Sequence, residues 1–322
     1  MSKILAFFVA LFAITAQAQT VVKVDGSSTV FPITEGIAED FQKQTKIKTT
    51  VGISGTGGGF KKFCRGEIDV QNASRPITAK EMEDCKAAGI TYYELPVAFD
   101  ALTVIIHPSN TWAQRLTVEQ LKRMWEPAAQ GKITNWNQVD PSFPNRPLKL
   151  FGAGSDSGTF DYFTEAVNGK SKASRGDYAA TEDDHVTIKG VTADQGALGY
   201  LGYAYYAENA SKLKAVAVTN DKGQAVAPSE KSVMDGSYNP LSRPIFIYVA
   251  VKSMDKPEVK QFVEFYMANA AKISKEVKYV PLPDKVYKAN LDHIARKRVG
   301  TIFGGKNEIG LTVEELVKRE AK

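Results

Sequence analysis

The sequence predicts an α/β protein with two lobes and mostly parallel sheets. Three segments share one layout: a short apolar strand, a turn rich in glycine, serine and threonine, and an amphipathic helix. Strands that alternate with helices in this way are typical of α/β folds with parallel sheets. Two further apolar segments, 97–106 and 244–251, predict strands that cross between lobes, because the chain between them has its own helix and core pattern.

The length of 322 residues is sufficient for two ordinary domains. We predict that residues 19–101 together with 247–322 form the first lobe, and that residues 102–246 form the second. Within the second lobe, Thr117 and Gln120 have the spacing of a capping box and predict the start of a helix.

The first 18 residues have the pattern of a signal peptide. Lys3 precedes an apolar stretch at 4–14, and Ala16 and Ala18 form a small-x-small cleavage site. The apolar stretch is too short to span a bilayer as a helix. We therefore expect export by a cleavable signal peptide and a mature chain that begins near Gln19.

Cys64 and Cys85 are 21 positions apart. In an exported protein the default expectation is one disulfide, and two free thiols are the alternative. A metal site is not expected, because no histidine is near either cysteine in sequence and two ligands do not complete a zinc site.

The formal net charge is +5, and the basic residues are scattered along the chain. The sequence therefore gives no indication of a nucleic-acid partner. A mild positive excess favours anions in general, but an ordinary basic surface explains it as well.

The three turns, at 25–29, 54–59 and 152–159, bring hydroxyls and unpaired backbone N–H groups to helix starts. Three such helix ends directed at one point would bind a tetrahedral oxyanion. The alternative for each turn is a simple helix N-cap. A nucleotide site is not expected, because Phe60 occupies the position of the third glycine in G-x-G-x-x-G and no Gly-Lys-Ser/Thr ending follows.

The string at 156–158 is similar to the nucleophile region of some serine hydrolases. A catalytic triad also needs a histidine base that an acid orients. None of the three histidines, His107, His185 and His293, occurs in a supporting motif. Serine catalysis is therefore not predicted.

Two charged residues near the turns are candidate ligand contacts. Arg75 follows a strand-like segment and precedes Pro76, and arginine suits bidentate contact with an oxyanion; a surface salt bridge is the alternative. Asp156 would accept the proton of monohydrogen phosphate, whereas sulfate would leave its charge unpaired. The alternative for Asp156 is a helix cap.

The chain resembles the phosphate-binding proteins of bacterial phosphate ABC importers, the PstS type. The resemblance covers most of the mature chain and rests on the segments 25–32, 54–60, 72–76, 131–136, 155–160 and 196–200. It implies a type II periplasmic-binding-protein fold, whose two lobes are joined by two crossing strands and close over one phosphate. It also implies a periplasmic, monomeric protein that is not an enzyme, needs no metal or cofactor, and delivers phosphate to a membrane permease.

The residues expected to contact phosphate are Ser28, Thr29, Val30, Thr56, Arg75, Asp156, Ser157, Gly158 and Thr159. The best-known branch of the family has an aspartate at the position of Arg75 and an arginine close to Ala153, so the two charges here have exchanged turns. Alternatives are a receptor for arsenate, sulfate or phosphonate, a phosphate sensor or adhesin, or a periplasmic phosphatase. The sequence does not rank Arg175, Asp183 and Asp184, which lie in a polar loop of the second lobe.

Overall fold

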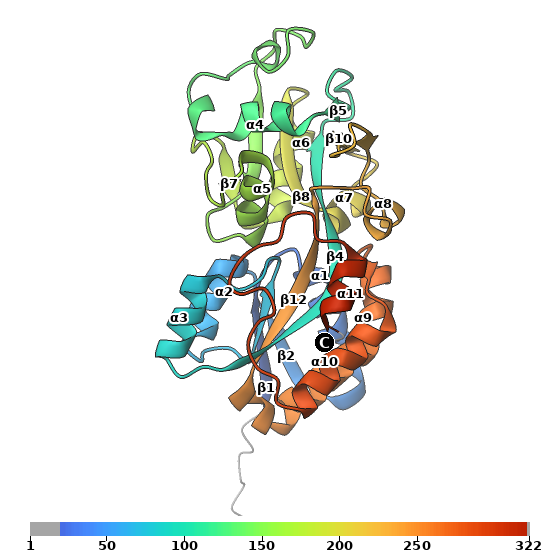
Figure 1. Ribbon diagram of the computed structural model, residues 1–322. Helices are drawn as coiled ribbons and strands as arrows, with labels where there is room; N and C mark the ends of the chain where they lie inside the picture. The colour runs from blue at the N-terminus through green and yellow to red at the C-terminus, as the bar shows by residue number, and fades with distance from the viewer. Residues whose placement is uncertain (1–19, 321–322) are drawn as a thin grey trace, which may run out of the picture.

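The computed structural model describes residues 20–320 and has two lobes, one above the other in Figure 1. The predicted signal peptide, residues 1–18, lies outside the described residues. Within the described part of the chain, no helix has both the length and the apolar character needed to cross a bilayer.

The first lobe begins with three repeats of strand and helix. Its elements are β1 (Val21–Gly26), α1 (Phe31–Thr45), β2 (Lys48–Val51), α2 (Gly55–Phe63), β3 (Val70–Ala73) and α3 (Ala79–Ala87). β1 pairs in parallel with β2 on one side and β3 on the other. This arrangement confirms the α/β pattern and places the N-termini of α1 and α2 at the same edge of the sheet.

The long strand β4 (Tyr92–Ile106) connects the two lobes, and all fifteen of its residues are buried. Its first part, up to Ala101, pairs with β12 (Ser242–Ala250), the second crossing strand. From Leu102 onward β4 pairs with β8 (Ala197–Gly202) of the second lobe. A strand covered on both faces needs the near-continuous apolar run that the sequence shows here.

The order of strands shows how the two lobes share one curved sheet. The order is β2-β1-β3-β12-β4-β8-β6-β7, with β6 (Lys149–Ala153) and β7 (Ala179–Thr181) in the second lobe. β13 (Val280–Pro281) and β9 (Lys214–Ala215) also pair with β4. The predicted lobe boundaries stay a prediction.

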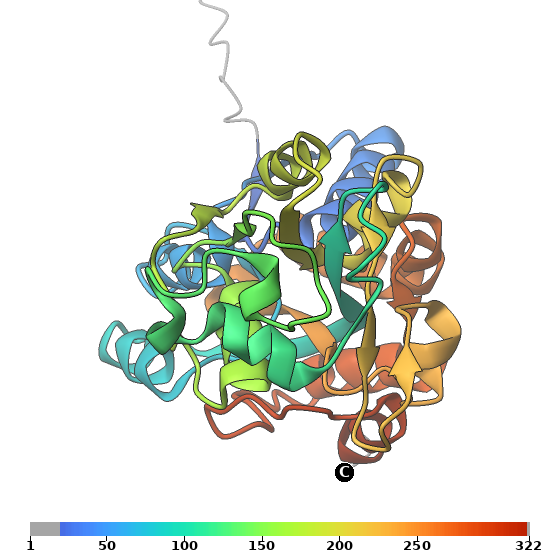
Figure 2. The same ribbon diagram turned by 90° about the horizontal axis from the view of Figure 1, so that it is seen from above.

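The second lobe contains the middle of the chain, which lies above the first lobe in Figure 1 and in front of it in Figure 2. Its helices are α4 (Val118–Trp125), α5 (Gly158–Asn168), α6 (Asp184–Thr192), α7 (Tyr203–Glu208) and α8 (Glu230–Met234), with 3-10 turns η1 (Pro127–Ala129) and η2 (Trp136–Gln138). A small sheet joins β11 (Ala225–Val226), β10 (Ala217–Thr219) and β5 (Arg115–Leu116). The predicted capping box is present, because Thr117 and Gln120 exchange side-chain and backbone hydrogen bonds at the start of α4.

After β12 the chain returns to the first lobe. The remaining elements are η3 (Val251–Asp255), α9 (Pro257–Glu276), α10 (Asp284–Ala295) and α11 (Val313–Glu320). α9 packs against α1 through aromatic side chains, with Phe41 5.4 Å from Phe262 and 5.5 Å from Phe265 between ring centroids. Both ends of the described chain therefore build the same lobe (Figure 1).

Candidate anion-binding site

The first turn leads from β1 into α1 without a side-chain cap. Gly26 has φ +131°, and a Cβ at this position would lie 2.3 Å from the carbonyl oxygen of Asn72, so the tight exit from β1 requires glycine. The N-cap residue of α1 is Val30, which has no side-chain oxygen. Ser28 and Thr29 are buried just before it. Their hydroxyls are therefore not explained by capping.

The second and third turns differ from each other in their caps. α2 begins at Gly55 after Ser54, whose side chain makes no capping hydrogen bond. At α5, Ser157 is the N-cap, and its hydroxyl accepts a hydrogen bond of 3.1 Å from the Thr159 backbone N–H. The simple N-cap alternative thus applies to Ser157 alone among these helix starts.

Hydroxyls from the two lobes meet between the three helix N-termini. The hydroxyl oxygens of Thr29 and Thr159 are 3.0 Å apart, and those of Thr56 and Ser74 are 3.2 Å apart. A Cβ on Gly158 would lie 2.5 Å from Thr56 Oγ1 and 2.6 Å from Ser74 Oγ. The structure therefore brings together the hydroxyls of all three predicted turns, in a field that favours negative charge.

The crossing strands add a buried charge pair that the sequence analysis did not identify. Arg243 on β12 lies directly opposite Asp100 on β4, and its Nη2 donates to the Asp100 carboxylate at 3.0 Å. The same Nη2 donates to Thr159 Oγ1 at 2.8 Å, and Nη1 donates to the Gly158 carbonyl at 3.2 Å. Burial raises the pKa of Asp100, and the charge of Arg243 opposes that shift. Arg243 is therefore a cation held among the site hydroxyls.

Arg75 has a different set of contacts from the one expected. Its side chain is 2% exposed, and its Nη1 and Nη2 each donate to a carboxylate oxygen of Glu81 at 2.8 Å. Its Nε donates to Asp161 at 2.7 Å, and Nη1 also donates to the Pro76 carbonyl. The guanidinium is therefore engaged by two carboxylates, as a buried rather than a surface ion pair.

Asp156 points its carboxylate outward, away from the expected role. The side chain is 41% exposed, and Lys61 Nζ donates to both of its oxygens, at 2.8 and 3.0 Å. Its backbone also joins the lobes, since its carbonyl accepts a hydrogen bond of 2.7 Å from the N–H of Gly57. In this structure the charges of Arg75 and Asp156 are thus paired with other side chains, and their predicted contacts with the anion stay a prediction.

A second buried carboxyl, Asp184, lies beside the site. Asp183 caps α6 by accepting from the N–H of His185, and Asp184 is the first residue of the helix. Among the described residues, Asp184 Oδ2 has no hydrogen-bond partner. Burial raises the pKa of Asp184 to about 6, and the Ser28 hydroxyl against it has the opposite effect. Because Asp100 raises this pKa and Arg243 lowers it, Asp184 is electrostatically coupled to the site.

Arg175 supports the second lobe from within. Its Nε and Nη2 donate to the Asp177 carboxylate at 2.5 and 2.8 Å, and its Nη1 donates to the carbonyls of Met124 and Ile133. The hydrogen bonds from Arg175 to the Asp177 carboxylate lower the pKa of Asp177 to about 2. Arg175 is therefore accounted for by the packing of its own lobe.

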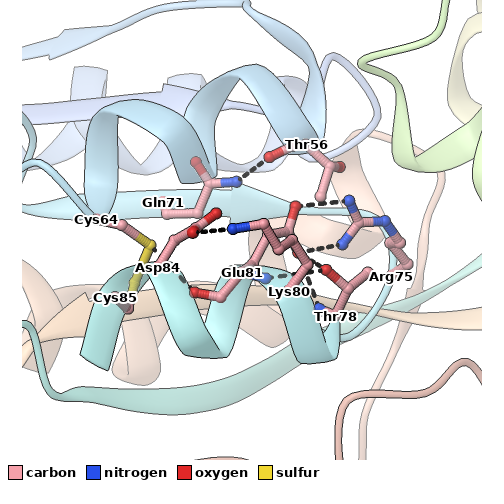
Figure 3. Close-up of a disulfide and its surroundings, with 9 residues drawn as sticks. All are labelled: Thr56, Cys64, Gln71, Arg75, Thr78, Lys80, Glu81, Asp84 and Cys85. Carbon is pink, nitrogen blue, oxygen red and sulfur yellow. Dashed lines mark hydrogen bonds and ion pairs between the residues drawn. A yellow bond between two sulfur atoms is a disulfide. The ribbon is translucent and has the colours of Figure 1, made fainter. Parts of the chain in front are cut away.

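The cysteines form a disulfide in the first lobe, as predicted. Cys64 follows α2 and Cys85 lies in α3, so the bond ties the two helices together (Figure 3). The same close-up shows Arg75 reaching Glu81 and Gln71 donating to the Thr56 carbonyl at 2.8 Å. The helix that carries Thr56 is thus held at both ends.

The three histidines of the sequence, which were considered as possible catalytic bases, make contacts of three different kinds. His107 Nδ1 pairs with Ser109, His185 packs on Tyr205, and His293 lies beside Arg298. Residues 20–320 contain no group of three or more His, Cys, Asp or Glu side chains placed to hold a metal. The site combines hydroxyls and helix N-termini with one cation, Arg243, and two buried carboxyls, Asp100 and Asp184.

Comparison with known proteins defines the class. The family model described as the PBP superfamily domain matches residues 13–270. Protein SphX of Synechococcus elongatus is 52% identical over 303 residues, which cover 94% of this chain and 89% of that protein. The phosphate-binding protein PstS of Staphylococcus saprophyticus is 38% identical over 283 residues, covering 86% of each chain.

Solved structures agree with this classification. A possible phosphate-binding protein from Planctomyces limnophilus is 48% identical, with a TM-score of 0.63, over 86% of this chain and 98% of that one. A putative phosphate ABC transporter substrate-binding protein from Clostridium perfringens, solved with bound phosphate, is 25% identical, with a TM-score of 0.69, over 82% of this chain and all of that one. The chain belongs to the PstS-type phosphate-binding family of the PBP superfamily.

Proposed function

We propose that this protein captures inorganic phosphate with high affinity between its lobes and delivers it to the membrane permease of an ABC importer. The observation that carries the proposal is the meeting of Thr29, Thr56 and Thr159 hydroxyls with Arg243 at three helix N-termini. Helix N-termini and buried arginines both stabilise oxyanions. The phosphate-binding relatives support the choice of anion.

The proposed contacts keep seven of the predicted residues and change the two charged ones. Hydroxyl and backbone N–H groups from both lobes donate to the phosphate oxygens, and Arg243 replaces Arg75 as the cation. The proposed ligand set is Ser28, Thr29, Val30, Thr56, Ser157, Gly158, Thr159 and Arg243.

Selectivity for phosphate over sulfate follows from the carboxylates beside the site. Asp100 and Asp184 are buried there, whereas Asp156 is not. Monohydrogen phosphate carries an O–H that can donate to a carboxylate, and sulfate at neutral pH carries none. An unpaired charge buried against sulfate costs on the order of several kcal/mol. We therefore propose Asp100 and Asp184 as the filter against sulfate, in the role first expected of Asp156.

Calorimetric titration tests the proposal directly. The protein is unfolded and refolded to remove carried-over ligand, and phosphate is titrated at neutral pH with and without a large excess of sulfate. We expect one phosphate per chain with an affinity that sulfate does not change. Competition by sulfate would refute the proposed role of Asp100 and Asp184 in excluding sulfate, and absence of phosphate binding would refute the proposed ligand. Arsenate, which has similar shape and protonation, is titrated in parallel.

Delivery and export need their own tests. We propose that the mature protein is a periplasmic monomer that needs no metal or cofactor. Phosphate-dependent stimulation of a reconstituted cognate permease would support delivery, and its absence would favour the sensor or adhesin alternative. Turnover of p-nitrophenyl phosphate, with or without divalent metals, would instead indicate a phosphatase, and we expect none.

A further inference from the structure

The buried cluster around Arg75 spans the two lobes. Arg75 follows β3 in the first lobe, directly after Ser74, and Glu81 is on α3 of the same lobe. Asp161 is in the first turn of α5 in the second lobe, three residues after Gly158. One guanidinium therefore carries a carboxylate partner from each lobe, at 2.8 Å and 2.7 Å.

The ion pair between Arg75 and Asp161 is almost completely buried. The side chains of Arg75 and Asp161 are each 2% exposed. The second oxygen of Asp161, Oδ1, has no hydrogen bond among the described residues, and Lys172 Nζ lies 3.8 Å from it. The buried negative charge of Asp161 is therefore balanced mainly by Arg75. A carboxylate that stays buried after losing such a partner is strongly destabilising.

Separation of the lobes affects the two partners of Arg75 differently. Glu81 would stay with Arg75, because both belong to the first lobe, whereas Asp161 would move away with α5 and become hydrated. The bond between Arg75 and Asp161 thus exists only when the lobes are in contact. This ion pair also lies next to the site. Ser74, the residue before Arg75, contacts Gly158 at the N-terminus of α5, where a Cβ on Gly158 would lie 2.6 Å from the Ser74 hydroxyl.

We propose that Arg75 and Asp161 form an interlobe latch that favours the closed, ligand-holding state without touching the anion. This inference rests on the proposed phosphate binding and assigns the two residues a positioning role. A second ion pair between the lobes, Lys61 with Asp156, is 62% and 41% exposed, so its effect on closure is small.

The test compares Asp161→Asn with Lys61→Gln, which removes the exposed interlobe pair. Phosphate binding is measured by calorimetry, association and dissociation rates by stopped flow, and folding by circular dichroism. For Asp161→Asn we expect a Kd at least tenfold higher, equivalent to about 1.4 kcal/mol. A faster dissociation rate should account for the change, with the association rate within threefold of wild type. Lys61→Gln should stay within twofold of wild type in Kd.

A second variant makes the test independent of whether Asp161→Asn folds. Arg75→Lys keeps a buried charge beside Glu81 but lacks the fork that reaches two carboxylates, so it should show the same change in dissociation rate. Two variants that bind phosphate within twofold of wild type would overturn the latch and leave phosphate binding intact. A wild-type protein that does not bind phosphate would instead refute the proposed function on which the latch rests.

Discussion

Replacement of Gly158 by alanine tests whether the lobes close to the contact seen here. The added Cβ would lie 2.5 Å from Thr56 Oγ1, 2.6 Å from Ser74 Oγ and 3.0 Å from Thr56 Cβ. The two distances to hydroxyl oxygens are roughly 1 Å below the ~3.5 Å at which non-bonded heavy atoms attract. Rotation of the Thr56 hydroxyl could relieve part of the clash, but it would break the 3.1 Å bond from the Ser74 N–H. The lobes must therefore stay about 1 Å further apart.

The expected loss of affinity follows from this separation. A shift of about 1 Å stretches each bond from one lobe to a phosphate held by the other, and a net hydrogen bond is worth about 1 kcal/mol. With about three such bonds lost, the Kd for phosphate should rise about 100-fold. Gly158 has no unusual φ and lies in a helix, so alanine should leave the ligand-free protein equally stable or up to ~1 kcal/mol more stable.

Calorimetry with phosphate and thermal unfolding without it measure the two effects separately. Gly176→Ala is the matched control, because its Cβ would meet only Gln130 Oε1, at an ordinary 3.5 Å. The control should bind phosphate as the wild type does. A Gly158→Ala protein with a Kd within threefold of wild type would refute the reasoning, since the anion would then be bound without this closure.

Three further predictions concern charge, pH and the disulfide. Arg243→Lys keeps the charge but loses the fork between Asp100 and the site, and phosphate titration should show at least a tenfold higher Kd; an unchanged Kd would show that the guanidinium fork is not needed for binding. Burial raises the pKa of Glu94 from 4.5 to about 7, so the folded state binds more protons than the unfolded chain between these values. Stability to urea should therefore fall as pH rises from 4.5 to 7, by up to about 3 kcal/mol, and Glu94→Gln should flatten this fall; the same slope in both proteins would contradict it. Replacing Cys64 and Cys85 by serine should lower the unfolding free energy by roughly 3 kcal/mol in urea titrations, and no change would mean that the loop closure contributes nothing.

The hydroxyls of the site could be predicted from sequence because their signal is local. An apolar strand, a Gly/Ser/Thr turn and a helix follow one another within a few residues, and parallel pairing brings such turns to one edge. The structure places Thr29 and Thr56 at one edge of the first lobe in this way, and Thr159 meets them from the second lobe. The fold class and the disulfide were predictable for similar reasons of pattern and spacing.

The charged groups could not be predicted, because their positions depend on long-range pairing. Asp100 and Arg243 are 143 positions apart, and only the register of β4 with β12 sets them opposite each other. The available hint was the few charged residues in two otherwise apolar strands, Glu94 and Asp100 in β4 and Arg243 in β12. For Arg75, the sequence identified a strand end but not the direction of the side chain, which Glu81 and Asp161 determine.

The place of β12 in the sheet has a consequence for the order in which the protein can fold. β12 lies between β3 and β4, although it follows them in the chain by more than one hundred and thirty residues. Until residues 242–250 have been synthesised, the facing edges of β3 and β4 have no partner, and the latter is an apolar edge of the kind that promotes aggregation. The first lobe therefore begins to be synthesised before the second lobe but can complete its sheet only after it. We expect nascent chains that stop before residue 242 to depend on chaperones.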